Sequence, residues 1–422
     1  MKRILVLFPN EWDQIEFNSA RYRDRYQFVY AGFDLFKFPE NMRLMIFNAH
    51  RFIERIVKRF ARTKIDGVLS TDEHFGAMVA AVVAERLGLP GAKPEAILIA
   101  QHKYYARIRA AEIAPEAVPR FAYFPYGIQA PEAIGLPFPM YVKPVKSTYS
   151  ILARRVDNFA ELRAHLTFKP LEKLILEKLI APFNQLGQER FLFQVDAHHL
   201  VAEELLTGEQ VTVEGMVYQG EVTDLGVVDS IMYPGTSAFK RFDYPSSLPW
   251  MVQQRMAALA AKLVKGYGFT DGLFNAEFFY DVSRDSSQLI EINPRMAYQF
   301  ADMREKVDGF NPYDALLALT VGDRPVVSVR AGPDKVSASF VLRKFGTPKL
   351  KRAPTNAEQR ALTERFSDAR LVFYIKHGGS LERELKWLGS YRYGLINLAG
   401  QDIATMHARY DEIVRALPFE FE

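Results

Sequence analysis

Cysteine is absent from the 422 residues of this sequence. Its absence excludes disulfide bonds, thiol nucleophiles and zinc–thiolate sites. Two nucleotide-binding motifs are also missing: there is no GxxxxGK(S/T) and no GxGxxG, and the nearest match, at residues 266–271, lacks the third glycine. If the chain binds a nucleotide, it therefore uses neither a P-loop nor a Rossmann fingerprint.

A strong charge of one sign is lacking as well, since 54 basic residues balance 50 acidic ones and the net charge is +4. Without a basic run interleaved with aromatic residues, this balance argues against binding to nucleic acid. No apolar run approaches the ~18 residues that a membrane-spanning helix requires. The N-terminus turns polar soon after its first apolar residues, which indicates a β-strand and not a signal peptide. We therefore expect a cytoplasmic protein with no nucleic-acid or membrane partner.

The length of the chain exceeds what one core usually holds, so two to four compact units are expected. The first 90 residues alternate strands, at 4–8, 28–31 and 67–70, with helices. This alternation predicts a parallel sheet in an α/β unit. Thr71 or Asp72 can cap a long Ala/Val-rich helix, and the polar run 70–74 after the third strand would line a crevice at the carboxyl edge of that sheet.

Beyond residue 90 the pattern changes from alternating strands and helices to paired strands. Residues from 92 onward are expected to be helical and then to turn through Pro115, Pro119 and Pro125. Further helices are expected at 158–167, 248–267, 311–320 and 402–416. The expected strands are 139–145, 173–180 (KLILEKLI), 200–206, a pair joined at Gln219-Gly220, 275–281, 289–295, 336–343, 369–376 and 391–400. Because turns and not long helices separate the last strands, they predict an antiparallel layer.

The most informative segment is the hairpin formed by NAEFFYD (275–281), a polar turn and LIEINPR (289–295). Glu291 and Asn293 are two apart on a strand, so they leave the same face, and Glu277 lies on the preceding strand. Two carboxylates and an amide oxygen suit Mg²⁺, or Mn²⁺, with phosphate oxygens as further ligands. Arg295 follows on the same face, and a cation beside a metal suits phosphoryl transfer. The alternative is a surface hairpin with ordinary charges.

Three further segments accompany this hairpin: HKYYAR (102–107), YVKPV (141–145) and EELLTGEQVTVEG (203–215). In this order the segments resemble those of ATP-grasp enzymes of the carboxylate–amine or carboxylate–thiol ligase type. That group includes biotin carboxylase, D-alanine–D-alanine ligase and the L-amino acid ligases. The resemblance is clear over residues 1–330 and extends in outline to 422.

The resemblance implies an ATP-grasp fold of mixed α/β and α+β class. An N-terminal parallel α/β pre-ATP-grasp domain would cover 1–95. A two-lobed ATP-grasp domain would cover 96–330, with a small lobe at about 125–205 and a large lobe at about 206–330. A C-terminal antiparallel β/α domain would cover 331–422. A homodimer is compatible with this organisation.

The resemblance also implies a set of ATP-binding residues. They are Lys103 and Lys143 for the phosphates, Ser147, the hinge residues Glu203, Glu204 and Leu206 for adenine, Gln210 for the ribose and Ile290 beneath the ring. Glu277, Glu291 and Asn293 would bind the metal. The family usually has a glycine-rich flap after the second lysine, whereas this chain has KSTYS (146–150), so the role of that segment stays open.

The implied activity is ATP-dependent ligation of a small-molecule carboxylate to an amine through an acyl phosphate, with ADP and phosphate as products. Arg295 and Lys143 would be catalytic. The alternatives are an ATP-binding regulatory or scaffold protein and a kinase that stops at a phosphorylated product. His74 would contact substrate or cap the next helix. Arg241, expected in a long loop, would bind a substrate carboxylate, as Arg295 would, or form a surface ion pair. The acid and the amine are not identified by the sequence.

Overall fold

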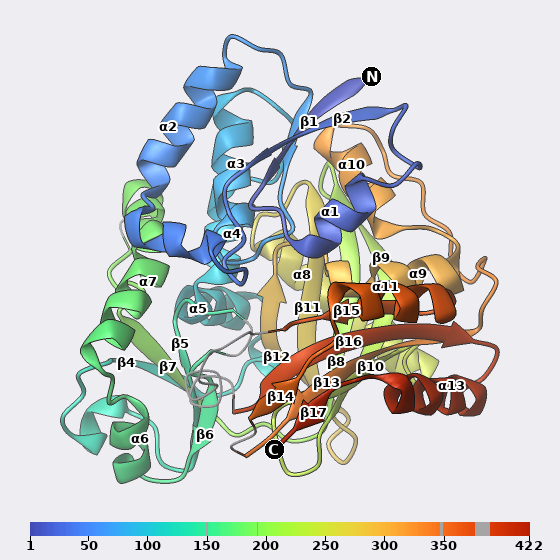
Figure 1. The fold of residues 1–422 in the computed structure, drawn as a ribbon. Coiled ribbons are helices and arrows are strands. Elements are labelled where there is room, and N and C mark those ends of the chain that lie inside the picture. Colours follow the sequence, from blue (N-terminus) through green and yellow to red (C-terminus); the bar gives the residue numbers. More distant parts are fainter. Residues whose placement is uncertain (149–150, 192, 347–348, 376–388) are drawn as a thin grey trace.

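The computed structural model describes residues 1–148, 151–191, 193–346, 349–375 and 389–422. Three main sheets of three, four and eight strands, and one small two-stranded sheet, organise these residues, with helices packed around them (Figure 1). Among the helices in these ranges, none combines the length and the apolar character needed to cross a membrane. The first two sheets and one end of the third surround the residues that the sequence singles out.

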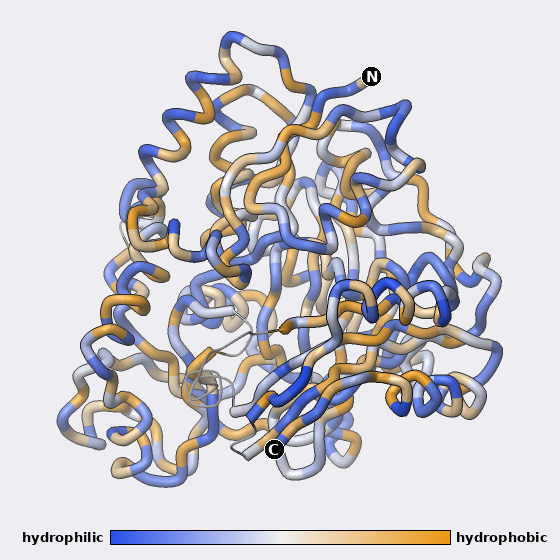
Figure 2. Tube along the Cα trace, in the orientation of Figure 1, coloured by the Kyte–Doolittle hydropathy of each residue, from blue (hydrophilic) through white to orange (hydrophobic). Residues whose placement is uncertain are grey.

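The N-terminal sheet is parallel, as predicted. It has the order β2-β1-β3 and consists of β1 (Lys2–Leu7), β2 (Tyr26–Ala31) and β3 (Gly67–Leu69). Its helices are α1 (Glu11–Phe17), the 3₁₀ helix η1 (Glu40–Ile46), α2 (Ala49–Phe60) and α3 (Gly76–Arg86). Hydrophobic and hydrophilic residues alternate along α2 (Figure 2), and the apolar face of this helix is buried. Asp72 accepts hydrogen bonds from the backbone N–H groups of Phe75 and Gly76 in the turn before α3, whose N-cap position is Phe75 and not the predicted Thr71 or Asp72.

The four-stranded sheet has the order β4-β7-β5-β6. Its strands are β4 (Phe121–Pro125), β5 (Met140–Pro144), β6 (Arg154–Val156) and β7 (His199–Glu204), and they pair antiparallel. The helices near it are α4 (Pro94–Gln101), α5 (Lys103–Ile113), α6 (Phe159–His165) and α7 (Pro170–Phe191), with the short 3₁₀ helices η2 (Pro115–Ala117) and η3 (Pro131–Ile134).

Two predictions in this region are wrong. Residues 173–180 are not a strand but the first half of α7. The buried side chains of α7, Leu179, Ile180, Phe183 and Leu186, recur at intervals of three and four, which is helical spacing, and the short apolar run alone did not distinguish helix from strand. The segment after residue 92 also ends differently, because β4 forms where only turns were expected.

The large sheet is antiparallel and has the order β12-β11-β8-β9-β10-β13-β16-β15. Its strands are β8 (Glu209–Tyr218), β9 (Glu221–Met232), β10 (Phe239–Tyr244), β11 (Gly272–Asp281), β12 (Ser286–Asn293), β13 (Val336–Lys344), β15 (Arg370–Phe373) and β16 (Tyr391–Gly400). The predicted antiparallel pairing of the C-terminal strands is confirmed. They extend the central sheet, because β13 pairs with β10, so the proposed division at residue 330 passes through one sheet.

Helices cover this sheet and fill the junctions with the other two. They are α8 (Trp250–Gly266), η4 (Tyr298–Phe300), α9 (Ala301–Asp308), α10 (Pro312–Thr320), α11 (Asn356–Arg365) and α13 (Ile403–Ala416). A small pair, β14 (Leu350–Arg352) and β17 (Glu420–Phe421), lies near the C-terminus. The helices predicted at 248–267, 311–320 and 402–416 are confirmed within two residues.

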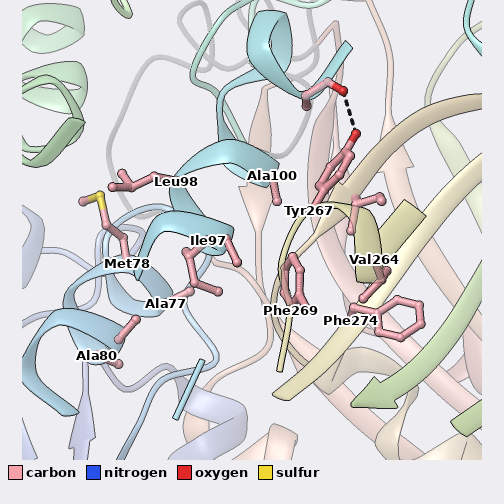
Figure 3. Packing of buried hydrophobic residues seen from close by; sticks show 14 of the residues in the cluster. Ala77, Met78, Ala80, Ile97, Leu98, Ala100, Val264, Tyr267, Phe269 and Phe274 are labelled. Carbon is pink, nitrogen blue, oxygen red and sulfur yellow. Dashed lines mark hydrogen bonds between the residues drawn. The ribbon is translucent and has the colours of Figure 1, made fainter. Parts of the chain in front are cut away.

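A shared apolar core joins the N-terminal unit to the large sheet. Figure 3 shows side chains of α3 and α4 on one side and Val264, Tyr267, Phe269 and Phe274 on the other. The Tyr267 hydroxyl donates a 2.7 Å hydrogen bond to the carbonyl of Ala106 on α5. This packing fixes α5 against α8, and α5 carries the first basic residues of the candidate site.

Candidate active site

The β11–β12 hairpin places the three proposed metal ligands together. Its register sets Glu277 opposite Glu291, and Asn275 opposite Asn293. The Asn293 side-chain amide donates to Glu277 Oε1 at 3.0 Å and to Asn275 Oδ1 at 3.2 Å. Gln210, on the neighbouring strand β8, donates to Glu277 Oε2 at 3.1 Å. An oxygen-rich surface therefore lies at the end of three adjacent strands.

Lys103 joins the hairpin from the first turn of α5. Its Nζ lies 2.9 Å from Glu291 Oε2 and donates to the carbonyl of Ser147 at 3.0 Å. Lys103 thereby links the hairpin to the segment that follows β5. Ser147 is buried, and its carbonyl accepts the bond from Lys103. Residues 149 and 150 of the proposed flap lie outside the described residues.

Lys143 lies on β5 within a buried group of charges. Its Nζ is 2.9 Å from Glu203 Oε2, and Arg107 Nε is 2.7 Å from the other oxygen of the same carboxylate. Both cations also donate to the carbonyl of Ile290, at 3.3 Å for Lys143 and 2.7 Å for Arg107. Buried charges are costly unless they are paired, and here each cation has a carboxylate partner.

Arg295 follows β12 and pairs with Glu73, at the carboxyl end of β3. Glu73 Oε2 accepts from Arg295 Nη2 at 2.6 Å and from Nε at 3.1 Å. The backbone carbonyl of Glu73 accepts from the side chains of Gln101 and Lys146, at 2.6 and 3.2 Å. The predicted crevice at residues 70–74 therefore meets the hairpin.

His74 is buried and ties the crevice to α7. Its Nε2 donates to the carbonyl of Leu179 at 3.0 Å, so Nδ1 is the acceptor and faces the Thr148 hydroxyl at 3.3 Å. Burial lowers the pKa of His74 to about 3, and nearby Lys146 acts in the same direction. Of the two roles considered for His74 from the sequence, the cap of α3 is not the one that the structure contains, because the N-cap position of this helix is Phe75.

Burial and neighbouring charges both shift the pKa values of the ionisable groups in the site, and for some groups they act in opposite directions. Burial, followed by the repulsion of Glu291, raises the pKa of Glu277. Burial alone would raise the pKa of Glu291 as well, but Lys103 and Lys143 offset it and hold that pKa below its usual range. Burial lowers the pKa of Lys143 to about 8 despite the attraction of Glu203. Of the two facing carboxylates, Glu291 is therefore the one that stays ionised, and Glu277 holds its proton more tightly than an ordinary glutamate.

The donor set of the hairpin fits a hard divalent cation. Two carboxylates and an amide are oxygen ligands of the kind that Mg²⁺ prefers, and substrate phosphates and water supply its other ligands. Burial, and after it the repulsion of Glu291, raises the pKa of Glu277, and a bound cation would offset both effects. No cluster of three or more His, Asp or Glu suited to a metal occurs in the described ranges, so any metal here would depend on Asn293 or on a substrate.

The remaining predicted residues are spread along the hinge and the large sheet. Glu204 is partly exposed and pairs with Arg120 at 2.9 Å, and Leu206 is half-buried. A cavity of about 470 Å³ lies beside Gln210, lined also by Ser230, Met232 and Phe279. A second cavity, next to Arg295, measures about 80 Å³, so the first is the one whose volume falls in the range usual for small-molecule pockets.

The prediction that Arg241 lies in a long loop is wrong. Arg241 is on β10, where it pairs with Asp243 at 2.8 Å two residues along the same strand. The bulge between Phe239 and Arg241 interrupts the alternation that would have marked this strand. The ion-pair alternative considered for Arg241 is therefore the contact that the structure contains.

Sequence reasoning missed Glu73 and Arg107. Arg107 lies four residues after Lys103, on the same face of α5, which is a signal that the sequence did offer. Glu73 lies in the polar run 70–74 that the sequence placed in the crevice, but its pairing with Arg295 could not be foreseen, because the two residues are 222 apart.

Comparison with known proteins gives one sequence relative and many structural ones. No family model matches the chain. Carnosine synthase 1 of Gallus gallus is 25% identical over 279 residues, which are 61% of this chain and 27% of the relative. The chain therefore spans about a quarter of the length of the curated relative it matches.

Many solved structures are similar to this chain, and two that match over nearly its whole length illustrate the likeness. The L-amino acid ligase from Bacillus licheniformis has a TM-score of 0.73 and 16% identity, with 100% of this chain and 99% of the other covered. N5-carboxyaminoimidazole synthase from Aspergillus clavatus, in complex with ADP and 5-aminoimidazole ribonucleotide, has a TM-score of 0.64 and 16% identity, with 98% of each chain covered. The chain thus has the fold of the ATP-grasp superfamily, and the recognition made from the sequence is confirmed at that level.

Proposed function

We propose that this protein is an ATP-dependent carboxylate–amine ligase that forms an amide bond through an acyl phosphate. One observation carries the proposal. The facing carboxylates Glu277 and Glu291 lie among three cations, with Lys103 2.9 Å from Glu291, and Lys143 and Arg295 reaching the same hairpin. The shared fold with a solved L-amino acid ligase and with a synthase solved in complex with ADP supports it.

In this proposal ATP lies between the four-stranded sheet and the large sheet. Lys103 and Lys143 contact its phosphates, with Ser147 beside Lys103. The backbone from Glu204 to Leu206 meets the adenine edge, Ile290 packs on the ring and Gln210 bonds the ribose. The two oxygens of Glu203 already hold Arg107 and Lys143, which favours a role in orienting Lys143 over a role in binding adenine.

The metal and Arg295 serve the phosphoryl transfer. Glu277, Glu291 and Asn293 would hold Mg²⁺, which would neutralise charge on the β- and γ-phosphates. Arg295 offers a planar fork of donors to the substrate carboxylate and to the charge that develops on the transferred group. Glu73 keeps that fork in one orientation through two hydrogen bonds to the same oxygen.

The reaction then needs no nucleophile from the protein. The substrate carboxylate attacks the γ-phosphorus, ADP leaves, and an acyl phosphate forms. An amine attacks the acyl carbon and phosphate leaves, which gives the amide. This scheme is compatible with a chain that has no cysteine. It leaves the identity of both substrates to experiment.

Release of ADP in the presence of ATP, Mg²⁺ and pairs of amino acids or other small acids and amines tests the proposal, with the product mass measured in parallel. We expect ADP and an amide in equal amounts with at least one pair. Arg295→Lys should lower kcat ~10²–10³-fold, because an ammonium cannot replace the fork at a developing charge. Arg255→Lys is the matched control, since Arg255 is exposed and pairs with Asp285 at the distant hairpin turn.

Two outcomes would contradict the ligase. ATP binding without ADP release for every pair would favour a regulatory or scaffold protein. ADP release with a phosphorylated product that persists in the presence of amines would favour a kinase. Equal loss of activity in Arg295→Lys and Arg255→Lys would remove Arg295 from the proposed mechanism.

A further inference from the structure

Lys146 is a buried amine next to the candidate site that the proposed phosphate contacts do not use. It follows β5, and only 3% of its surface is exposed. Its Nζ donates to the backbone carbonyl of Glu73 at 3.2 Å and lies 5.5 Å from the centre of the Phe183 ring. Within the described ranges it forms no ion pair with a carboxylate, unlike Lys103 and Lys143.

The contacts of Lys146 place it on the substrate side of the site. Lys103 and Lys143 reach the hairpin and the hinge strand, where the phosphates and the adenine are proposed to bind. Lys146 instead contacts the backbone of Glu73, in the crevice of the N-terminal sheet, and Phe183 of α7. The side chain of Glu73 pairs with Arg295, the group proposed to bind the substrate carboxylate. Lys146 and Arg295 therefore contact the same residue, Glu73, through its backbone carbonyl and its carboxylate.

We propose that Lys146 is the general base that takes a proton from the substrate ammonium before the amine attacks the acyl phosphate. This inference rests on the proposed ligase function. An ammonium has no lone pair, so it cannot attack, and within this scheme no other group has been assigned to remove its proton. A neutral lysine beside the acyl group would fill that role.

The step balances without any further reactant. One N–H bond of the ammonium breaks, and its proton moves to the Lys146 lone pair and then to water. The freed amine lone pair forms the C–N bond, and the C–O bond to phosphate breaks with its electron pair on phosphate. A second proton of the former ammonium leaves with the phosphate, so the products are the amide, hydrogen phosphate and one proton in solution.

The surroundings of Lys146 make its neutral form accessible at a lower pH than for an exposed lysine, with the charged form still in excess at pH 7. Burial is the main cause, and it lowers the pKa of Lys146 to about 8. The charged and titratable groups that face it are Asp72, Glu73, His74, Lys103 and Glu291. Glu73 opposes the shift and Lys103 adds to it. A base works best when its pKa is near the working pH.

A comparison of two nucleophiles, hydroxylamine and the amine substrate, distinguishes a defect in base catalysis from a defect in any earlier step of the reaction. Hydroxylamine is largely unprotonated at neutral pH, so it captures the acyl phosphate as a hydroxamate without a base. The amine substrate is an ammonium at that pH and needs one. Lys146→Arg keeps the positive charge and much of the size but cannot lose its proton, whereas Lys146→Met removes the amine.

We expect Lys146→Arg to keep hydroxamate formation within about threefold of the wild type and to lose amide formation ~10²-fold or more, the usual contribution of a base. At saturating amine the wild-type amide rate should level off above pH 8. In Lys146→Arg it should keep rising, ~tenfold per pH unit, as free amine accumulates. Lys64→Arg, at an exposed lysine, is the control and should match the wild type in both reactions.

Each other outcome overturns the inference. Equal losses of hydroxamate and amide in Lys146→Arg and Lys146→Met would assign Lys146 to ATP binding or to structure. An amide rate in Lys146→Arg close to that of the wild type would show that its proton acceptor is not needed. If neither variant folds, the wild type alone provides the test. A ratio of amide to hydroxamate that stays constant from pH 6 to 9 would then show that no proton acceptor is needed. Absence of hydroxamate with every carboxylate in the wild type would instead refute the ligase itself.

Discussion

Single residues of the candidate site are held by charge pairs that cross between distant segments. Lys103 meets Glu291, Lys143 meets Glu203, and Arg295 meets Glu73. Each pair joins side chains that are at most about a quarter exposed. Inside a protein such a pair contributes little net stability, but loss of one partner leaves a charge that nothing compensates. The pairs therefore fix the orientation of the cations more than they stabilise the fold.

Glu203 and its neighbour Glu204 allow a direct test of that reasoning. Glu203→Gln should lower the free energy of unfolding by about 3 kcal/mol, because Arg107 and Lys143 would both lose a buried carboxylate. Glu204→Gln should cost less than about 1 kcal/mol, because Glu204 pairs with Arg120 in contact with solvent. Denaturant unfolding of the two variants measures the difference. Similar costs for both would show that the buried pairs do not constrain the site.

Helices and strands were predictable from the sequence where the local hydrophobic pattern alone distinguishes the two. The hairpin at β11 and β12, the turn at Gln219-Gly220 and helix α10 are confirmed, because a period of two or of 3.6 repeats over enough residues. Helix α7 was mistaken for a strand because five of the eight residues 173–180 are apolar and the helical face appears only when residues up to Leu186 are included. Local pattern also says nothing of partners far apart in sequence, such as Arg107 and the carbonyl of Ile290.

The turn into β8 depends on Gly208, and Gly220 serves as its matched control. Both have positive φ, +119° and +80°. A Cβ on Gly208 would lie 2.2 Å from the carbonyl oxygen of Tyr280, whereas one on Gly220 would meet nothing within 4 Å. Gly220→Ala should therefore cost only the backbone strain, about 1–2 kcal/mol.

Gly208→Ala should cost at least twice as much as Gly220→Ala, since β8 must also move away from β11. Because β8 carries Gln210 and β11 carries Glu277, Gly208→Ala should also reduce the thermal stabilisation that ATP with Mg²⁺ confers, and Gly220→Ala should not. Melting temperatures with and without ATP measure both effects. Equal costs, with ATP stabilisation unchanged in both variants, would show that the space around Gly208 is not limiting.

The molecule as a whole brings its site together from three sheets that the chain forms in order. The parallel sheet supplies Glu73, the four-stranded sheet supplies Lys143 and Glu203, and the large sheet supplies the hairpin (Figure 1). Two buried histidines join segments at these boundaries. His74 links the end of β3 to α7, and His102 links the start of α5 to the carbonyl of Val195 at 2.7 Å.

These two histidines should make the folded state sensitive to acid. Burial lowers the pKa of His74 to about 3 and that of His102 to about 4, from an ordinary value of 6.5. As the pH falls below 6.5 the unfolded chain therefore binds protons that the folded protein does not bind. The stability is complete above that pH and is lost as the pH falls towards 4, by about 2 kcal/mol for each ring between pH 7 and pH 5.

Replacement of either histidine should remove its share of that loss, whatever it costs at neutral pH. In His74→Asn and His102→Asn the fall in unfolding free energy from pH 7 to pH 5 should be about 2 kcal/mol smaller than in the wild type, and in the double variant about 4 kcal/mol smaller. His50→Gln is the control, because His50 is half exposed and its change should leave the fall unaltered. Urea unfolding of the wild type, the two single variants, the double variant and the control at both pH values measures these falls. An equal fall in the wild type and the double variant would mean that neither ring is kept neutral by the fold, and would place the acid sensitivity in the carboxylates.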